Sequence, residues 1–240
     1  MFRTYICEYL HKKGIISKKE MLDMAFVEKD DFADEISLVT GISVNDFNAL
    51  ILDFQRDMGI SDDALAAIRS DNLDDIISSI ATYGKNADTH YNKLTKLALK
   101  TICVHSNGHI IFKPINAIES YDFEKLCTVE ILGEVNLSLC LAGNGDSLLP
   151  IASGFAERAF DQINPEALDS VCELLNSICG MYISDTRQKQ LDVELMTPKI
   201  FHNKKMVSGD FIYRVPLLAE NHEIDLLVTE SYGGSINKFS

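Results

Sequence analysis

The sequence predicts an α+β protein in which a small all-helical region precedes a domain of long helices packed on a mostly antiparallel sheet. Residues 1–85 carry helix starts and stops but no strand pattern, whereas residues 86–240 alternate strand patterns with helix patterns. The strongest helix pattern, over residues 164–181, lies in the second part. We therefore expect two domains, with the boundary at the short polar stretch after Gly84.

The N-terminal region is predicted to be a series of short helices. Gly14, Gly41 and Gly59 each follow a helical segment, at the position where glycine commonly ends a helix. Ser17 and Glu20 form a capping box, which opens a helix. The expected helices cover residues 2–13, 17–27, 31–40, 43–58, a short segment from 61, and 73–83.

Two segments of this region, KKGIISKKEML and RDMGISDDALAAI, repeat a pattern of glycine, isoleucine and a serine that starts a helix. This form is similar to the N-terminal helical modules of type II secretion ATPases, some of which bind cyclic dinucleotides. It equally suits a small helical bundle held by ordinary caps and apolar stripes. In either case we expect a regulatory or partner-docking role for residues 1–85.

The second domain is predicted to mix both element types in chain order. A helix over 89–105 comes first, and a turn signal at Asn107-Gly108 leads into an apolar segment. Alternating residues over 135–141 predict a strand with one buried and one wet face. The expected strands cover 126–132, 135–141, a segment ending at Pro198, 211–215 and 224–228.

Composition excludes several classes of partner and site. The 240 residues carry a formal net charge of −14, which would repel nucleic acid and anionic membranes. The first residues lack the apolar core of a signal peptide, and no segment has the roughly 18 apolar residues of a membrane span. The 6 cysteines and 6 histidines show no metal-binding spacing. We therefore expect a cytoplasmic protein with reduced cysteines and no metal.

Residues 164–181 predict an amphipathic helix with an unusual polar face. Asn164 and Pro165 form a strong start signal, and an apolar stripe follows at helical spacing. The opposite face carries Asp169, Glu173, Asn176 and Gly180. A solvated face is the ordinary interpretation of such residues. Gly180 argues against it, because a glycine inside a helix costs about 1 kcal/mol and is typical of a site where something approaches the backbone.

The order Asp169-x3-Glu173-x2-Asn176, with Gly180 next and Pro198 beyond the helix, resembles the signature of the CheC/CheX/FliY family, whose members are phosphatases of the chemotaxis response regulator CheY. The resemblance covers about residues 88–235. It includes four further segments: LGEVNLSLCLAGNGDSLLPIASGFAERAF at 132–160, TPKIF at 197–201, VSGDFIYRVPL at 207–217 and HEIDLLVTE at 222–230. The resemblance implies a CheX-like domain.

The resemblance also implies roles for the polar face. Asn176 would hold the attacking water, Glu173 would pair with the active-site lysine of a CheY-like receiver domain, Asp169 would add a contact and Gly180 would permit close approach. The receiver would supply its own phospho-aspartate and Mg²⁺, so no cofactor is expected on this chain. Thr89 stands where a second E-x-x-N pair would need its glutamate, so only one site is expected.

The resemblance implies a homodimer that pairs through sheet edges, and FIYRVPL and EIDLLVT are apolar strands of the kind that add to a neighbour. Pro216 would limit pairing near the end of the first, which makes the other strands the better candidates. Two functions are open. In the first, the chain is an aspartyl-phosphate phosphatase acting on a receiver domain. In the second, it is a non-catalytic CheX-like module that docks a signalling partner. The complete set of acid, amide and glycine favours the first.

Overall fold

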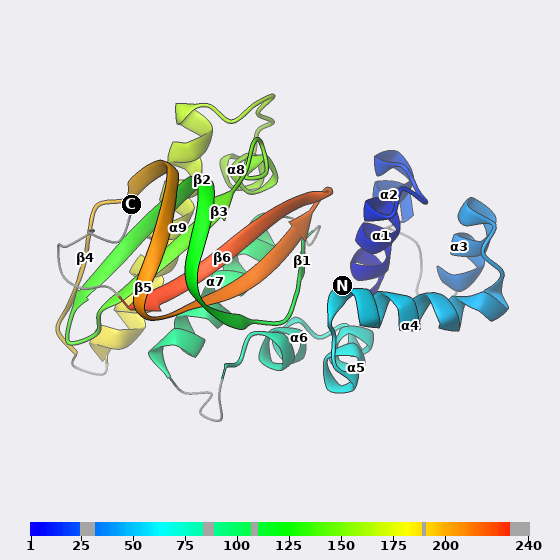
Figure 1. Ribbon diagram of the computed structural model, residues 1–240, viewed down its shortest axis with the longest axis horizontal. Helices are drawn as coiled ribbons and strands as arrows, with labels where there is room; N and C mark the ends of the chain where they lie inside the picture. The colour runs from blue at the N-terminus through cyan, green and yellow to red at the C-terminus, as the bar shows by residue number, and fades with distance from the viewer. Residues whose placement is uncertain (25–31, 84–88, 107–109, 189–190, 231–240) are drawn as a thin grey trace.

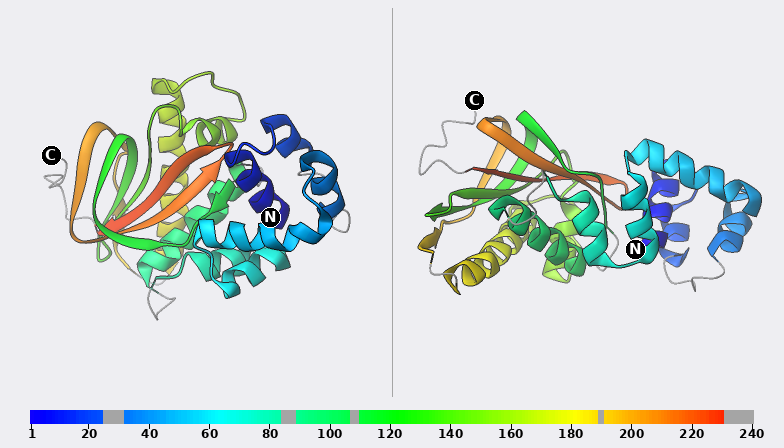
Figure 2. Two further views of the ribbon diagram at one scale, coloured as in Figure 1. Left: turned by 45° about the vertical axis from the view of Figure 1, so that its right-hand side comes forward. Right: turned by 90° about the horizontal axis from the view of Figure 1, so that it is seen from below.

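The computed structural model describes residues 1–24, 32–83, 89–106, 110–188 and 191–230 (Figure 1). An N-terminal group of helices lies beside one end of a sheet, and three further helices lie against one face of that sheet (Figure 2). The predicted fold class, helices on an antiparallel sheet after an all-helical region, is confirmed.

The helices of the N-terminal region are α1 Phe2–Lys12, α2 Lys18–Met24, α3 Phe32–Thr40, the 3₁₀ turn η2 Val44–Asp46, α4 Phe47–Met58, α5 Asp62–Ser70 and α6 Leu73–Ile80. The capping box is confirmed, because the backbone N–H of Glu20 donates to the Ser17 hydroxyl and that of Ser17 donates to the Glu20 carboxylate. Gly14, Gly41 and Gly59 adopt positive φ angles of 70°, 73° and 66°. The predicted extension of the second helix to residue 27 lies outside the described residues.

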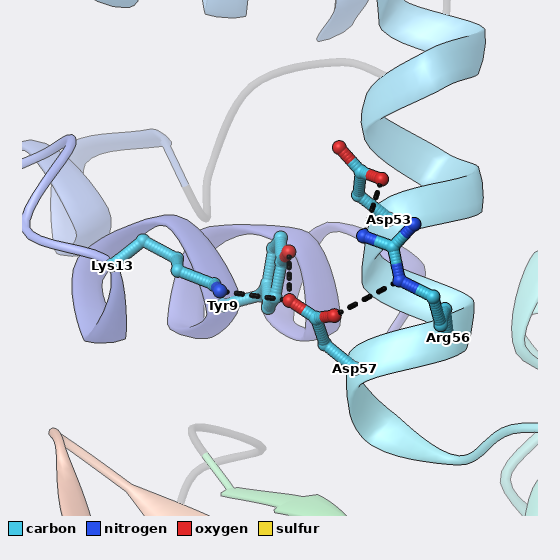
Figure 3. A network of polar contacts seen from close by, with 5 residues as sticks. All are labelled: Tyr9, Lys13, Asp53, Arg56 and Asp57. Carbon is cyan, nitrogen blue, oxygen red and sulfur yellow. Dashed lines mark hydrogen bonds and ion pairs between the residues drawn. The ribbon is translucent and has the colours of Figure 1, made fainter.

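A polar network on the outer side of this region ties α1 to α4 (Figure 3). Asp57 accepts from the Tyr9 hydroxyl at 2.9 Å and pairs with Lys13 at 2.7 Å. These two hydrogen bonds lower the pKa of Asp57 to about 2. Arg56 extends the network to Asp53 at 2.7 Å. Tyr9 is buried, but the charged side chains of the network are partly or well exposed, so their ion pairs contribute little to stability.

The sheet contains β1 Ile110–Phe112, β2 Asn116–Gly133, β3 Leu137–Gly143, β4 Val193–Leu195, β5 Lys199–Ala219 and β6 His222–Glu230. Its order is β1-β5-β6-β3-β2-β4, and the strand pairs are antiparallel. The long strands β2 and β5 also pair with each other, so that β2, β3, β6 and β5 close into a ring. A second apolar cluster, separate from the main core, contains Phe123, Leu126, Cys140, Ala142, Met206, Ile212 and Leu227 of these four strands.

Ring closure corrects two expectations from the sequence. The predicted wet face of residues 135–141 is wrong for β3, in which all seven residues are buried, because Cys140 and Ala142 belong to the second apolar cluster. The strands expected to offer free edges for a homodimer are internal. β6 is hydrogen-bonded to β3 on one side and β5 on the other, and β5 pairs with both β6 and β2. A homodimer would need another surface.

The helices α7 His90–His105, α8 Leu149–Ala156 and α9 Pro165–Gln188 pack on the outside of the ring and bury the main core (Figure 2). This core does not stop at residue 85. The same cluster of buried apolar side chains continues from these helices through β1 into α1, α4 and α6. The helical region is therefore built onto the sheet domain, and the division into two independent domains stays a prediction.

Contacts between the two parts are polar as well as apolar. The Tyr5 hydroxyl donates to the carbonyl of Phe112 at 3.2 Å and accepts from its N–H at 3.1 Å. Lys18 pairs with Glu220 in the β5–β6 turn at 2.7 Å. These groups join α1 and α2 to β1 and to the β5–β6 turn. Within the described part of the chain, no helix combines the length and apolar character that crossing a bilayer requires.

Candidate functional site

The helix α9 is the element that presents the candidate site. The Asn164 side chain accepts from the backbone N–H of Ala167 at 2.8 Å, which confirms the predicted cap. One side of the helix is fixed in the core by residues that are at most 5% exposed: Leu168, Val171, Leu175, Ile178, Cys179 and Tyr182. Because this stripe is the one that the sequence pattern predicts, the rotation of α9 about its axis is set by packing.

That rotation turns the predicted site residues outward. Asp169 and Glu173 are exposed, and Asn176 and Gly180 are half-buried on the same side of the helix. The side chains of Asp169, Glu173 and Asn176 have neither a hydrogen bond nor an ion pair with another group in the described part of the chain. Nearby, Glu166 is different, because it pairs with Arg158. The acid and the amide are therefore available to a partner.

Gly180 has no packing reason to be glycine within the described residues. A Cβ atom placed there meets no heavy atom within 4 Å. At Gly154 of α8, by contrast, a Cβ would collide with the backbone carbonyl of His105, so that glycine is required by packing of α8 on α7. The bare backbone at Gly180 is thus left open to solvent beside Asn176.

A pair of thiols beneath α9 was not predicted from the sequence. Cys127 of β2 is fully buried, and its thiol hydrogen-bonds with Cys172 of α9, which lies next to Glu173. That hydrogen bond and burial raise the pKa of Cys127, so its thiol stays protonated. The Cys127 sulfur also lies 3.7 Å from the carbonyl oxygen of Leu168. These contacts seat the site-bearing turns of α9 on β2, and no sequence spacing signals them.

The neighbouring helix α7 supplies no second acid–amide pair. Thr89 caps α7 by accepting from the backbone N–H of Asn92 at 3.2 Å, and Asn92 itself is only 1% exposed. Among the described residues, histidine, cysteine, aspartate and glutamate side chains do not gather in groups of three or more that could hold a metal ion. The free face of α9 thus presents a carboxylate and an amide, at Glu173 and Asn176.

A sequence profile of the family described as "Chemotaxis phosphatase CheX" matches residues 126–210. This stretch contains β3, β4, α8 and α9, and with them the four residues Asp169, Glu173, Asn176 and Gly180. A comparison with curated proteins found no match.

Solved structures of low sequence identity resemble the chain. One is a CheC-like superfamily protein from Shewanella sp. PV-4, with 17% identity, 60% of this chain and 99% of the other covered, and a TM-score of 0.49. Another is the chemotaxis protein CheX from Desulfovibrio desulfuricans, with 13% identity, 58% and 99% coverage, and a TM-score of 0.47. The CheX–CheY–BeF₃–Mg²⁺ complex from Borrelia burgdorferi has 15% identity, 60% and 99% coverage, and a TM-score of 0.47.

Proposed function

We propose that the chain hydrolyses the aspartyl phosphate of a CheY-like receiver domain, on the premise that its residues 126–210 match the model of the CheX family. The observation that carries the proposal is the pair Glu173 and Asn176. Both side chains point away from the core and lack partners in the described part of the chain, within the stretch that matches the family.

The chemistry of this pair suits a reaction that is completed by two proteins. Phosphoryl transfer depends mainly on positioning and electrostatic stabilisation, and a receiver domain brings its own phospho-aspartate and Mg²⁺. The chain then needs only to place a water molecule in line with the scissile bond. A neutral amide suits this task, because its oxygen accepts and its nitrogen donates hydrogen bonds. Asn176 is the amide on the free face, so we assign the water to it.

Glu173 serves docking in this proposal. It lies three residues before Asn176, which corresponds to a rise of about 4.5 Å along the helix and places both side chains on one side. Its carboxylate pairs with the active-site lysine of the receiver, a charge-assisted contact that fixes the register of α9 in the receiver's active site. Asp169, one turn earlier, adds a second negative contact, and Gly180 lets the receiver approach the helix backbone.

The proposal is tested by measuring inorganic phosphate released from phosphorylated receiver domains of the same genome, with and without the full chain. The wild-type chain is expected to accelerate release from at least one receiver. Asn176→Ala should abolish the acceleration while receiver binding is largely retained, and Glu173→Ala should weaken both. Asn48→Ala, at an exposed asparagine of α4 far from this face in the sequence, is the matched control and should keep full activity. Undiminished turnover by Asn176→Ala would overturn the mechanism.

The non-catalytic alternative rests on the same free face, since an exposed acid and a bare backbone also suit docking alone. It predicts that the chain binds a receiver domain and leaves its rate of dephosphorylation unchanged.

The phosphatase proposal includes a cytoplasmic homodimer. Sedimentation velocity of the full chain measures the mass of the species in solution. If that species is a monomer and is active, the homodimer is wrong.

A further inference from the structure

The exposed face of α9 extends beyond the four predicted site residues, and its charged and apolar side chains follow one another in a defined order along the helix. Residues four apart on an α-helix form a continuous row along its surface. One such row on α9 is exposed at every position: Asp169, Glu173, Ser177, Met181 and Asp185. The parallel row through Asn176, Gly180 and Ser184 contains only small or uncharged side chains. Along this row the face is acidic at Asp169 and Glu173, apolar around Met181, and acidic again at Asp185.

Met181 differs from every other large apolar residue of α9 whose side chain is described. It is 45% exposed, whereas the rest are buried: Leu168, Val171, Leu174, Leu175, Ile178 and Ile183. Its neighbours on the face are Gly180, with open space where a Cβ would stand, and the small side chains of Ser177 and Ser184. The methionine and the bare backbone thus form a low apolar platform next to Asn176.

We propose that Met181 and Gly180 form the apolar part of the docking surface for the receiver domain, and that the order of Glu173, Asn176 and Met181 along α9 fixes the direction in which the receiver lies on it. The inference rests on the proposed function. Glu173 takes the receiver's cationic active-site end, and Met181, about 12 Å further along the helix at 1.5 Å per residue, takes an apolar patch beside it.

Charge complementarity supports this occupant over a second copy of the chain. Asp169 and Glu173 carry unpaired negative charge in the described part of a chain whose net charge is −14, so two copies placed face to face on α9 would repel each other. A partner with a cation beside an apolar patch matches both the acidic residues Asp169 and Glu173 and the apolar Met181. A flexible, unbranched methionine adapts well to such a patch.

The test separates binding from turnover. Receiver domains carrying either phosphate or the phosphate mimic beryllofluoride are titrated with full-length variants, and both phosphate release and the dissociation constant are measured. Met181→Ser should raise KM and Kd about tenfold and leave kcat within twofold, because Met181 touches the partner outside the reacting centre. Met181→Leu should restore the wild-type values. Leu52→Ser on α4, at a side chain 64% exposed, is the matched control and should change nothing.

Each outcome decides one claim. If Met181→Ser leaves KM and Kd within twofold of wild type while Glu173→Ala raises them, the apolar part of the surface is wrong and the proposed function stands. If the chain binds the beryllofluoride form with a Kd that depends on Met181 but never accelerates phosphate release, the surface stands and catalysis fails. If the chain binds none of the genome's receiver domains in either state, both are overturned.

Discussion

The side-chain amide of Asn92 makes two hydrogen bonds with the backbone of Tyr83. The Tyr83 N–H donates to Asn92 Oδ1 at 3.1 Å, and Asn92 Nδ2 donates to the Tyr83 carbonyl at 3.2 Å. Asn92 lies in the first turn of α7 and is 1% exposed. This contact ties the segment that follows α6 to α7. The helix α6 itself ends at Ile80 and not at the predicted Tyr83.

Asn92→Ala should destabilise the chain without impairing its chemistry. The substitution removes both hydrogen bonds between the buried Asn92 amide and the Tyr83 backbone, which costs about 1–3 kcal/mol of unfolding free energy. Urea denaturation measures this loss, and phosphate release per folded molecule should equal that of the wild type. Asn176→Ala is the matched contrast, because the Asn176 amide has no partner in the described part of the chain. It should lose activity and keep stability.

The contrast would fail if the two asparagines behaved alike. A stability loss in Asn176→Ala similar to that in Asn92→Ala would mean that the Asn176 amide is structural. A loss of turnover in Asn92→Ala at temperatures where it is fully folded would mean that α7 also carries part of the site.

Substitutions at Gly180 should separate stability from binding. A side chain meets no atom within 4 Å there, and both alanine and leucine are better helix formers than glycine by up to about 1 kcal/mol. Gly180→Ala and Gly180→Leu should therefore hold or raise the melting temperature. Receiver affinity should fall with the size of the added side chain, more for leucine than for alanine. Equal affinities across glycine, alanine and leucine would mean that the partner does not approach this turn.

The sequence predicted best those features that depend on residues close together in the chain. The cap at Asn164, the capping box at Ser17 and Glu20, and the stripe on α9 each depend on residues within a few positions of one another, and all are confirmed. The outward direction of Glu173 follows from that stripe, because burying one side of a helix exposes the other. What Glu173 and Asn176 do stays a prediction, since exposure alone does not assign a role.

Long-range contacts were not predicted, because nothing local encodes them. Residues 116–125 were not predicted as strand; their partners in β5 lie more than 70 residues away in sequence. That pairing closes the ring and buries the face of β3 that alternation marked as wet. Similarly, the Tyr5 hydroxyl meets Phe112 across 107 positions. The shared core of the helical region and the sheet domain depends on contacts of this kind.

From the buried Glu8, at the junction of the helical region and the sheet domain, we predict that the free energy of unfolding has an unusual pH dependence. It lies in α1, is 1% exposed and accepts from the backbone N–H of Glu220 at 3.0 Å, while its other oxygen has no partner in the described structure. Burial raises the pKa of Glu8 from about 4.5 to about 7. Hydrogen bonds from the β5–β6 turn and the nearby His11 only partly oppose this shift, and the Glu220 carboxylate adds to it.

The sign of the effect follows from proton uptake. Between pH 4.5 and 7 the folded chain retains a proton on Glu8 that the unfolded chain has lost, so this residue's contribution to stability falls as pH rises through that window and is constant above it. Glu8→Gln cannot ionise and still accepts from Glu220. It should match the wild type near pH 4.5 and exceed it at pH 8, by at most about 3 kcal/mol. Urea denaturation at the two pH values measures the difference.

Glu223→Gln is the control of opposite sign at the same junction. The Glu223 carboxylate is well exposed and pairs with Lys12, and this hydrogen bond lowers its pKa. Its contribution is present above its unfolded pKa and is lost as pH falls, so Glu223→Gln should slightly destabilise the chain at pH 8, by less than about 1 kcal/mol. If Glu8→Gln is instead less stable than the wild type at pH 8, the ionised Glu8 carboxylate is a favourable anchor for the β5–β6 turn. In that case burial does not dominate its titration.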